Sequence, residues 1–174
     1  SKDSDFVFCC VGNDNDLKEV TLGTEGAFHS VKKDAVFIDN TTASAKIARE
    51  LFKAAKEKGF GFLDAPVSGG QAGAENGQLT VMIGGENKDF EKAQDVIKCY
   101  SKKMKVLGPA GSGQLAKMVN QICIVGLVQG LSEGIRFGQN AGLNMEDVIE
   151  VISKGAAQSW QMENRYKTMI TDKF

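Results

Sequence analysis

Apolar and polar positions divide the chain into two parts with different periodicity. In the first part, short continuous apolar runs alternate with amphipathic segments. Runs of this length are typical of strands buried on both faces of a parallel sheet. The predicted strands cover residues 6–11, 35–39, 62–67, 79–85 and 105–108. Strands that alternate with helices predict an α/β fold class with a largely parallel sheet.

Helices are predicted between these strands, over residues 13–20 and 90–101 and in the segment before Gly59. Thr41 or Thr42 is expected to cap the N-terminus of that middle helix, because a hydroxyl can accept a hydrogen bond from an N–H group of the first turn. Gly59 is expected to end it, since glycine readily adopts the left-handed conformation that follows a helix.

After Pro109 the pattern becomes helical throughout. The spacing predicts one long helix over residues 113–139, a second over 145–153 with Asn144 as its cap, and a third over 160–169. Four glycines recur every fourth residue in the long helix, at positions 126, 130, 134 and 138. Each destabilises a helix by roughly 1 kcal/mol relative to alanine. We therefore expect another element to approach this face, either from the same chain or from a second subunit.

Composition narrows the possible partners. The net charge is −1, with basic and acidic residues interspersed, so a nucleic acid partner is not expected. The four cysteines form no C-x-x-C pair, which favours reduced thiols in a cytoplasmic compartment, or the mitochondrial matrix in a eukaryote. No metal site is predicted. The longest apolar run, residues 122–128, is too short to span a membrane.

The first candidate for chemistry is Ser68-Gly69-Gly70, which follows the predicted strand "FLDAPV". Bare backbone N–H groups at such a point can form a nest for a carboxylate, and the serine hydroxyl adds a donor. An ordinary turn is the alternative, and the three residues alone do not decide between the two.

The second candidate is "GPAGSGQLAKMVNQ", at the start of the long helix. Lys117, Asn120 and Gln121 are spaced at i, i+3 and i+4, so they share one helical face. An ammonium group and two amides can bind or protonate an oxygen-rich ligand. A solvated surface lysine is the common alternative.

Together the two motifs resemble the β-hydroxyacid dehydrogenase family, which includes 3-hydroxyisobutyrate dehydrogenase. "DAPVSGG" is similar to the family's substrate-binding signature, and "GSGQLAKMVNQ" to its catalytic signature. "FIDNTTAS" resembles the strand end beside the nicotinamide, and "GAAQSWQMENR" the segment that opens the helical domain. The resemblance covers essentially the whole chain and implies the cofactor NAD or NADP.

The resemblance assigns roles to nine residues. Lys117 would be the general acid/base. The substrate would be held by Ser68, Gly69, Gly70, Asn120 and Gln121. The cofactor would be contacted by Val11, Gly12 and Thr42. Two positions depart from the family pattern. Gly12 replaces the usual proline, and Gln121 replaces the usual asparagine four residues after the lysine, which leaves open whether Asn120 or Gln121 meets the substrate.

The resemblance also implies a domain organisation. Residues 1–110 would be the C-terminal part of a Rossmann-type domain, residues 111–139 an interdomain helix, and residues 140–174 the start of an all-helical domain. No G-x-G-x-x-G fingerprint occurs near the N-terminus of the chain. We therefore expect an internal portion of a longer protein.

The expected function is NAD(P)-dependent oxidation of a small 3-hydroxy acid, or the reverse reduction, by a homo-oligomer. The alternative is a non-catalytic module that kept the fold as a binding or assembly unit. The chain decides neither between NAD and NADP nor between hydroxyisobutyrate, tartronate semialdehyde and succinic semialdehyde.

Overall fold

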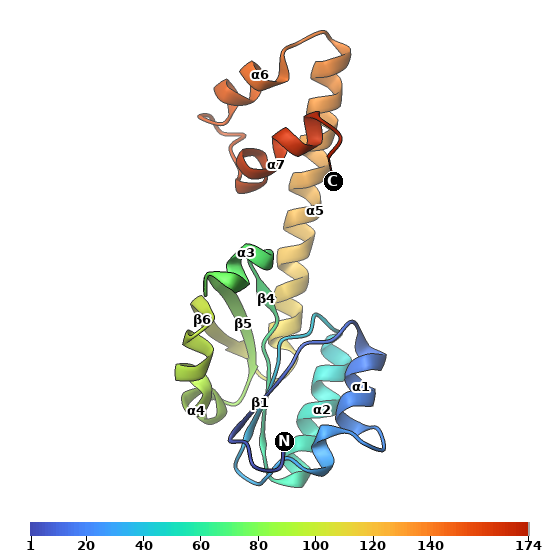
Figure 1. Ribbon diagram of the computed structural model, residues 1–174, viewed down its shortest axis with the longest axis vertical. Coiled ribbons are helices and arrows are strands. Elements are labelled where there is room, and N and C mark those ends of the chain that lie inside the picture. Colours follow the sequence, from blue (N-terminus) through green and yellow to red (C-terminus); the bar gives the residue numbers. More distant parts are fainter. Residues whose placement is uncertain (174) are drawn as a thin grey trace. The chain divides into compact units, whose positions relative to one another are not determined.

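A computed structural model describes residues 1–173 and divides the chain into two compact units, Ser1–Met118 and Val119–Phe174. The boundary lies inside helix α5 (Ser112–Asn140), which matches the long helix predicted over residues 113–139. The first unit is α/β and the second is helical, as the change of periodicity predicts (Figure 1).

The first unit is built on a six-stranded sheet. Its strands are β1 (Phe6–Cys9), β2 (Val36–Asp39), β3 (Gly61–Asp64), β4 (Val67–Ser68), β5 (Leu79–Gly85) and β6 (Ser101–Gly108). The spatial order is β1-β2-β3-β5-β4, and β6 pairs with the other side of β5. β1, β2 and β3 are mutually parallel, and so are β5 and β6.

The sheet is mixed, because β5 runs antiparallel to both β3 and β4. The predicted strand over residues 62–67 is split in two at Ala65-Pro66. Proline has no N–H group for a strand ladder. Its carbonyl still accepts a hydrogen bond from Met82 N at 3.0 Å, so both halves remain beside β5.

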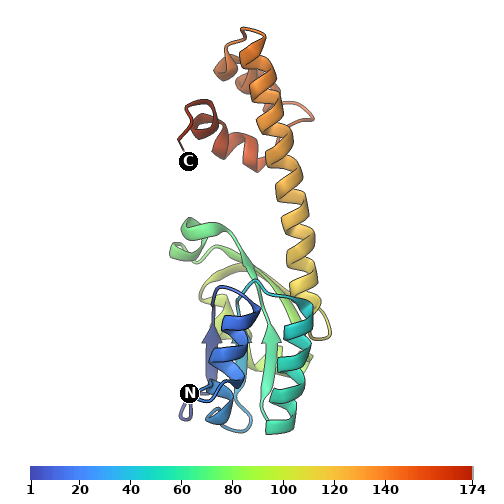
Figure 2. The same cartoon turned by 90° about the vertical axis from the view of Figure 1, so that its right-hand side faces the viewer.

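Helices cover both faces of this sheet (Figure 1). α1 (Asp14–Leu22) and α2 (Ala45–Lys58) pack on one face with Phe37 and Phe62. α4 (Asn87–Lys98) packs on the other, where Ile38 and Leu63 face it. Successive strand residues thus supply opposite cores, which explains the continuous apolar runs. Figure 2 shows α1 and α2 side by side.

β1 departs from the prediction that it is buried on both faces. Phe8 is 45% exposed, and the strand ends at Cys9 instead of residue 11. Within the described residues β1 is an edge strand, paired only with β2, so part of its surface stays open. Two short helices were not predicted: a 3₁₀ turn, Ala27–His29, and α3 (Gly70–Glu75), which follows Ser68-Gly69.

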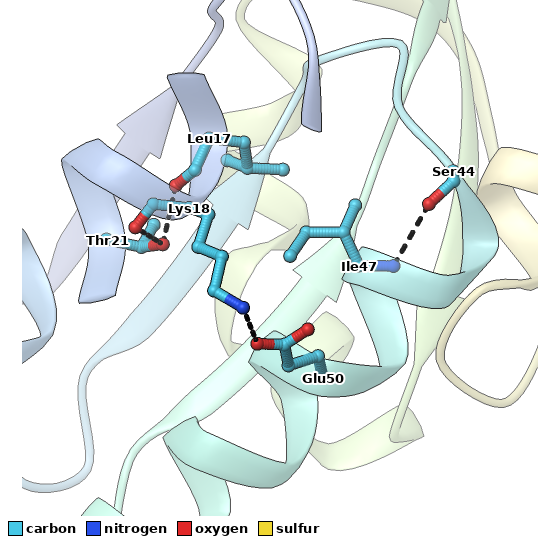
Figure 3. A network of polar contacts seen from close by, with 6 residues as sticks. All are labelled: Leu17, Lys18, Thr21, Ser44, Ile47 and Glu50. Carbon is cyan, nitrogen blue, oxygen red and sulfur yellow. Dashed lines mark hydrogen bonds and ion pairs between the residues drawn. The ribbon is translucent and has the colours of Figure 1, made fainter. Parts of the chain in front are cut away.

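The cap of α2 is Ser44, so the prediction of Thr41 or Thr42 is wrong. Ser44 Oγ accepts from Ile47 N at 3.1 Å, and Figure 3 shows this bond beside the Lys18–Glu50 ion pair of 2.6 Å that joins α1 to α2. Gly59 ends α2 in the left-handed conformation, with φ at 84°, as predicted.

The second unit contains α6 (Met145–Ile152) and α7 (Trp160–Ile170) beside the C-terminal part of α5. Asn144 caps α6 as predicted, accepting from Glu146 N at 3.1 Å. A small core joins these helices, formed by Leu131, Ile135, Met145, Ile149 and Met162. By length and composition α5 could cross a membrane, and little of its most apolar stretch is buried, but one such helix is weak evidence.

The glycine face of α5 is in contact with another element at one end only. A Cβ atom on Gly138 would clash with the Met145 side chain, so α6 approaches closely there. Cβ atoms on Gly126, Gly130 and Gly134 would meet nothing within 4 Å. These three glycines line an apolar groove of about 330 Å³ between α5, α6 and the start of α7. Close packing of α6 on α5 therefore explains why position 138 is a glycine. It does not explain the glycines at positions 126, 130 and 134.

Candidate active site

Three groups of predicted site residues follow the carboxyl ends of the parallel strands β1, β2 and β3. Val11 and Gly12 follow β1, Thr42 follows β2, and Ser68 to Gly70 follow β3 through the Ala65-Pro66 corner. Because β1, β2 and β3 are parallel, these ends share one edge of the sheet, where α/β proteins usually bind ligands.

The substrate signature forms a tight, glycine-dependent corner. Ser68 ends β4, and Gly69 and Gly70 then adopt φ angles of 142° and 62°, which side chains disfavour. A Cβ atom on Gly69 would also lie 2.9 Å from Leu79 Cδ2. Both glycine backbones are exposed. The corner thus leaves bare backbone accessible at the sheet edge, as a carboxylate nest requires.

Lys117 lies next to this corner and is only 8% exposed. Its Nζ donates to the carbonyl of Val67 at 2.8 Å, immediately before Ser68. Burial lowers the pKa of Lys117 below its ordinary value, because a low-dielectric environment disfavours the charged ammonium. Among the described residues, Lys117 is therefore neither a solvated surface lysine nor a partner in an ion pair.

Asp64, the last residue of β3, binds the start of α5. One carboxylate oxygen accepts from Gly111 N at 2.7 Å and the other from Gln114 N at 3.0 Å. The carboxylate is fully buried. Burial raises its pKa, and the backbone N–H bonds act in the opposite direction. A carboxylate at a helix N-terminus satisfies N–H groups that lack partners within the helix. The helix that carries Lys117 is thereby fixed to the strand that leads to Ser68.

Two further contacts tie the end of β2 to its neighbours. Asn40 Nδ2 donates to the carbonyl of Ala65 at 2.7 Å, which holds the corner before Ser68. Thr41 Oγ1 accepts from Val11 N at 3.1 Å, which joins the predicted cofactor segments after β1 and β2. Thr42 itself is exposed beside them.

Asp39 ends β2 as a second buried carboxyl group, directly across from Asp64 in the strand register. Its Oδ1 accepts from Thr41 N at 3.0 Å, while Oδ2 has no partner among residues 1–173. Burial raises the pKa of Asp39 to about 6. Burial also raises the pKa of Cys9, on the neighbouring strand, to about 11, which keeps that thiol protonated.

Asn120 and Gln121 follow Lys117 on α5, in the second unit. Asn120 Nδ2 donates to Gln121 Oε1 at 3.0 Å, so the two amides bind each other. Asn120 is half-buried and Gln121 is exposed. Which of them would meet a substrate stays open.

Three residues of the candidate site were not predicted from the sequence: Asp64, Gln114 and Asn40. A hint existed for Asp64, since an acid inside an otherwise apolar strand requires hydrogen-bond partners. Nothing in the local pattern points to the partners of Gln114, because they lie 71 and 73 residues away in the chain.

Two family models match this chain and together cover nearly all of it. Residues 1–108 match the family model of the NAD binding domain of 6-phosphogluconate dehydrogenase. Residues 111–174 match that of NADP-dependent 3-hydroxyisobutyrate dehydrogenase, described as NAD-binding. Both models thus describe parts of nicotinamide-dependent enzymes.

Individual relatives are longer than this chain. An uncharacterized oxidoreductase of Shewanella frigidimarina is 61% identical over 95% of the chain, which spans 57% of that protein. The mitochondrial 3-hydroxyisobutyrate dehydrogenase of Drosophila melanogaster is 34% identical over 94% of the chain, which spans 50% of it.

Among solved structures, the 3-hydroxyisobutyrate dehydrogenase of Mycobacterium tuberculosis with L-serine superimposes with a TM-score of 0.84. It is 27% identical, and the match covers 94% of this chain and 55% of that one. The family models, the relatives and the shared fold lead to one conclusion: the chain belongs to the β-hydroxyacid dehydrogenase family.

Proposed function

We propose that the whole protein is an NAD(P)-dependent dehydrogenase of a small 3-hydroxy acid, with Lys117 as its general acid/base. The observation that carries this proposal is the buried Lys117 ammonium group beside the Ser68-Gly69-Gly70 corner, bonded to Val67 O at 2.8 Å. A lysine with a lowered pKa beside an open glycine backbone combines a proton acceptor with an anion site.

The proposed substrate class follows from the position of Lys117 next to the Ser68-Gly69-Gly70 corner. Ser68 and the bare backbone of Gly69 and Gly70 would hold the carboxylate, and Asn120 or Gln121 would orient the rest of the molecule. Ser68 directly follows Val67, whose carbonyl accepts a hydrogen bond from Lys117. A carboxylate at the corner and a hydroxyl at Lys117 would therefore have to lie close together, as they do in a 3-hydroxy acid. Hydroxyisobutyrate and tartronate semialdehyde share this arrangement of a carboxylate and a reacting oxygen, whereas succinic semialdehyde has its reacting oxygen one carbon further from the carboxylate.

The cofactor part rests on the loops after β1 and β2. Val11 and Gly12 are joined to the β2 loop by the bond between Val11 N and Thr41 Oγ1, and Thr42 is exposed next to it. Gly12 lacks a Cβ that would lie 2.7 Å from Asp16 Oδ2, so its backbone can lie close to the adjacent helix. These residues fit the edge of a dinucleotide site at the carboxyl ends of the strands. A bound nicotinamide would supply the acceptor or donor of hydride.

The proton chemistry belongs to Lys117. In the oxidation direction, neutral Nζ takes the proton of the substrate hydroxyl, the C–H bond electrons leave as hydride, and a carbonyl forms. In the reverse direction the ammonium returns the proton to the developing alkoxide. Because burial lowers the pKa of Lys117, the neutral form is available at lower pH than for a solvated lysine. Oxidation is therefore expected to accelerate with rising pH, and reduction to slow.

A survey of substrates tests this function. The whole protein is assayed with NAD and with NADP, in both directions, against the three acids or semialdehydes above. The control is a neutral ester or amide of each acid. Dinucleotide-dependent turnover that prefers the acids supports the proposal. No turnover with any acid, although the dinucleotide binds, would favour a non-catalytic module.

The remaining partners are predictions of the same kind. We expect a homo-oligomer without a nucleic acid or membrane partner, in the cytoplasm or the mitochondrial matrix. Light scattering of the purified protein measures its oligomeric state directly, and a monomer at micromolar concentration would contradict the expected homo-oligomer.

A further inference from the structure

Gln114 is a fully buried amide that connects three segments of the candidate site. Its backbone N donates to Asp64 Oδ2 at 3.0 Å, at the end of β3. Its side-chain Nε2 donates to the carbonyl of Thr41 at 2.7 Å, and its Oε1 accepts from Ala43 N at 3.0 Å. Gln114 thus binds the end of β3, which leads to Ser68, and the backbone groups before and after Thr42.

The side chain matches its partners in a way that few residues can. Thr41 O needs a donor and Ala43 N needs an acceptor, and an amide supplies both from one planar group. A carboxylate of the same length has no donor, and methionine has neither a donor nor a good acceptor. Because the site is buried, neither backbone group can turn to water instead.

Gln114 also lies one helical turn before Lys117. Three residues of α5 correspond to an axial rise of about 4.5 Å. Lys117 is held at its other end by Val67 O. The position of Lys117 relative to the Thr41–Ala43 segment is therefore set through the Gln114 side chain and the short stretch of helix between them.

We propose that Gln114 is a positioning residue for the reaction: its buried amide fixes the distance between the Lys117 helix and the Thr41–Ala43 segment that presents Thr42. This inference rests on the proposed function, in which Lys117 moves the proton and Thr42 contacts the cofactor. Gln114 touches neither substrate nor reacting atoms and acts through the elements that it joins. Misplacement of reacting groups by about 1 Å can lower a rate roughly 100-fold.

The test uses Gln114→Met in the whole protein, at a temperature where the variant is fully folded. We expect kcat to fall roughly 10- to 100-fold and the KM for the dinucleotide to rise. The control is Ile97→Val or Ile97→Ala, whichever lowers the melting temperature as much as Gln114→Met does. Ile97 is fully buried in the core on the α4 face of the sheet. The matched control is expected to keep kcat within about twofold of wild type.

Two readouts separate positioning from a purely structural role. In a Lys117→Ala background, Gln114→Met is expected to lower the remaining kcat less than about threefold, because no lysine is left to position. In Gln114→Glu, a protonated carboxyl can donate to Thr41 O and accept from Ala43 N. The ratio of kcat between this variant and wild type is therefore expected to rise as pH falls.

The outcomes are distinct. If folded Gln114→Met keeps kcat within about twofold of the Ile97 control, or if its effect is the same with and without Lys117, the positioning role is wrong. If Lys117→Ala itself retains normal turnover, the proposed function fails whatever Gln114 does. If Lys117→Ala lowers kcat roughly 100-fold and Gln114→Met is normal, only the inference about Gln114 fails.

Discussion

Replacing Asp39 by asparagine is predicted to change how stability depends on pH. Asp39 is fully buried, and Oδ2 has no partner among the described residues. Burial raises its pKa from the ordinary value of 3.8 to about 6, so the folded protein binds this proton more tightly than the unfolded chain. The stabilisation from this proton is fully present below the unfolded pKa, and it is lost as pH rises through about 6.

The magnitude follows from these two pKa values. Between about pH 4.5 and 7, ionisation of Asp39 removes about 2 kcal/mol from the free energy of unfolding of the wild type. Asparagine keeps an oxygen for the bond from Thr41 N and cannot ionise. The variant therefore loses this pH dependence, whatever its absolute stability.

The assay is urea unfolding of wild type and Asp39→Asn without cofactor, across that pH range. The relevant quantity is the difference in unfolding free energy between the two proteins, because all other titrating groups cancel. We expect this difference to move in favour of the variant by about 2 kcal/mol as pH rises. Parallel pH profiles would mean that Asp39 is already ionised in the folded protein, with a partner for Oδ2.

Three other substitutions have defined outcomes. Ser68→Ala is expected to raise KM for an acid substrate about tenfold or more and to spare its neutral amide, because a hydrogen bond to a charged group contributes about 1.5–3 kcal/mol; equal effects on both would make the corner an ordinary turn. Gly113→Ala places a Cβ 2.5 Å from the carbonyls of Asp64 and Met82, so thermal unfolding is expected to show a loss of about 2 kcal/mol or more, and an unchanged melting temperature would contradict the close approach. Gly130→Ala meets nothing within 4 Å and is expected to stabilise the helix by about 1 kcal/mol; a loss of stability in the whole protein would show that another element covers this face.

The sequence predicts elements better than it predicts their direction. The run in β5 is apolar whether its neighbour is parallel or antiparallel, so the pattern of residues 79–85 locates the strand and leaves its orientation open. Caps show the same limit. Thr41, Thr42 and Ser44 all carry hydroxyls near the start of α2, and the local pattern does not distinguish them. In the structure Thr41 Oγ1 accepts from Val11 N, and Ser44 Oγ accepts from Ile47 N as the cap.

Some residues of the candidate site could be predicted from the sequence, and others could not. Lys117 and Ser68 belong to contiguous motifs, so a family resemblance finds them, and the fold places Lys117 beside the residue before Ser68. Gln114 and Asp64 depend on contacts between segments about 50 to 73 residues apart. A local pattern contains no information on such pairs, and only the assembled sheet edge reveals them.

In the proposed function, Lys117 moves the proton. The most direct test of this role is kcat for oxidation of the acid by the whole protein, for wild type and Lys117→Ala, with Lys105→Ala on the exposed part of β6 as the control. We predict a loss of roughly 100-fold or more for Lys117→Ala, the usual scale for a general acid/base, with little change in dinucleotide affinity and none for the control. Near-normal turnover by Lys117→Ala would mean that another group moves the proton.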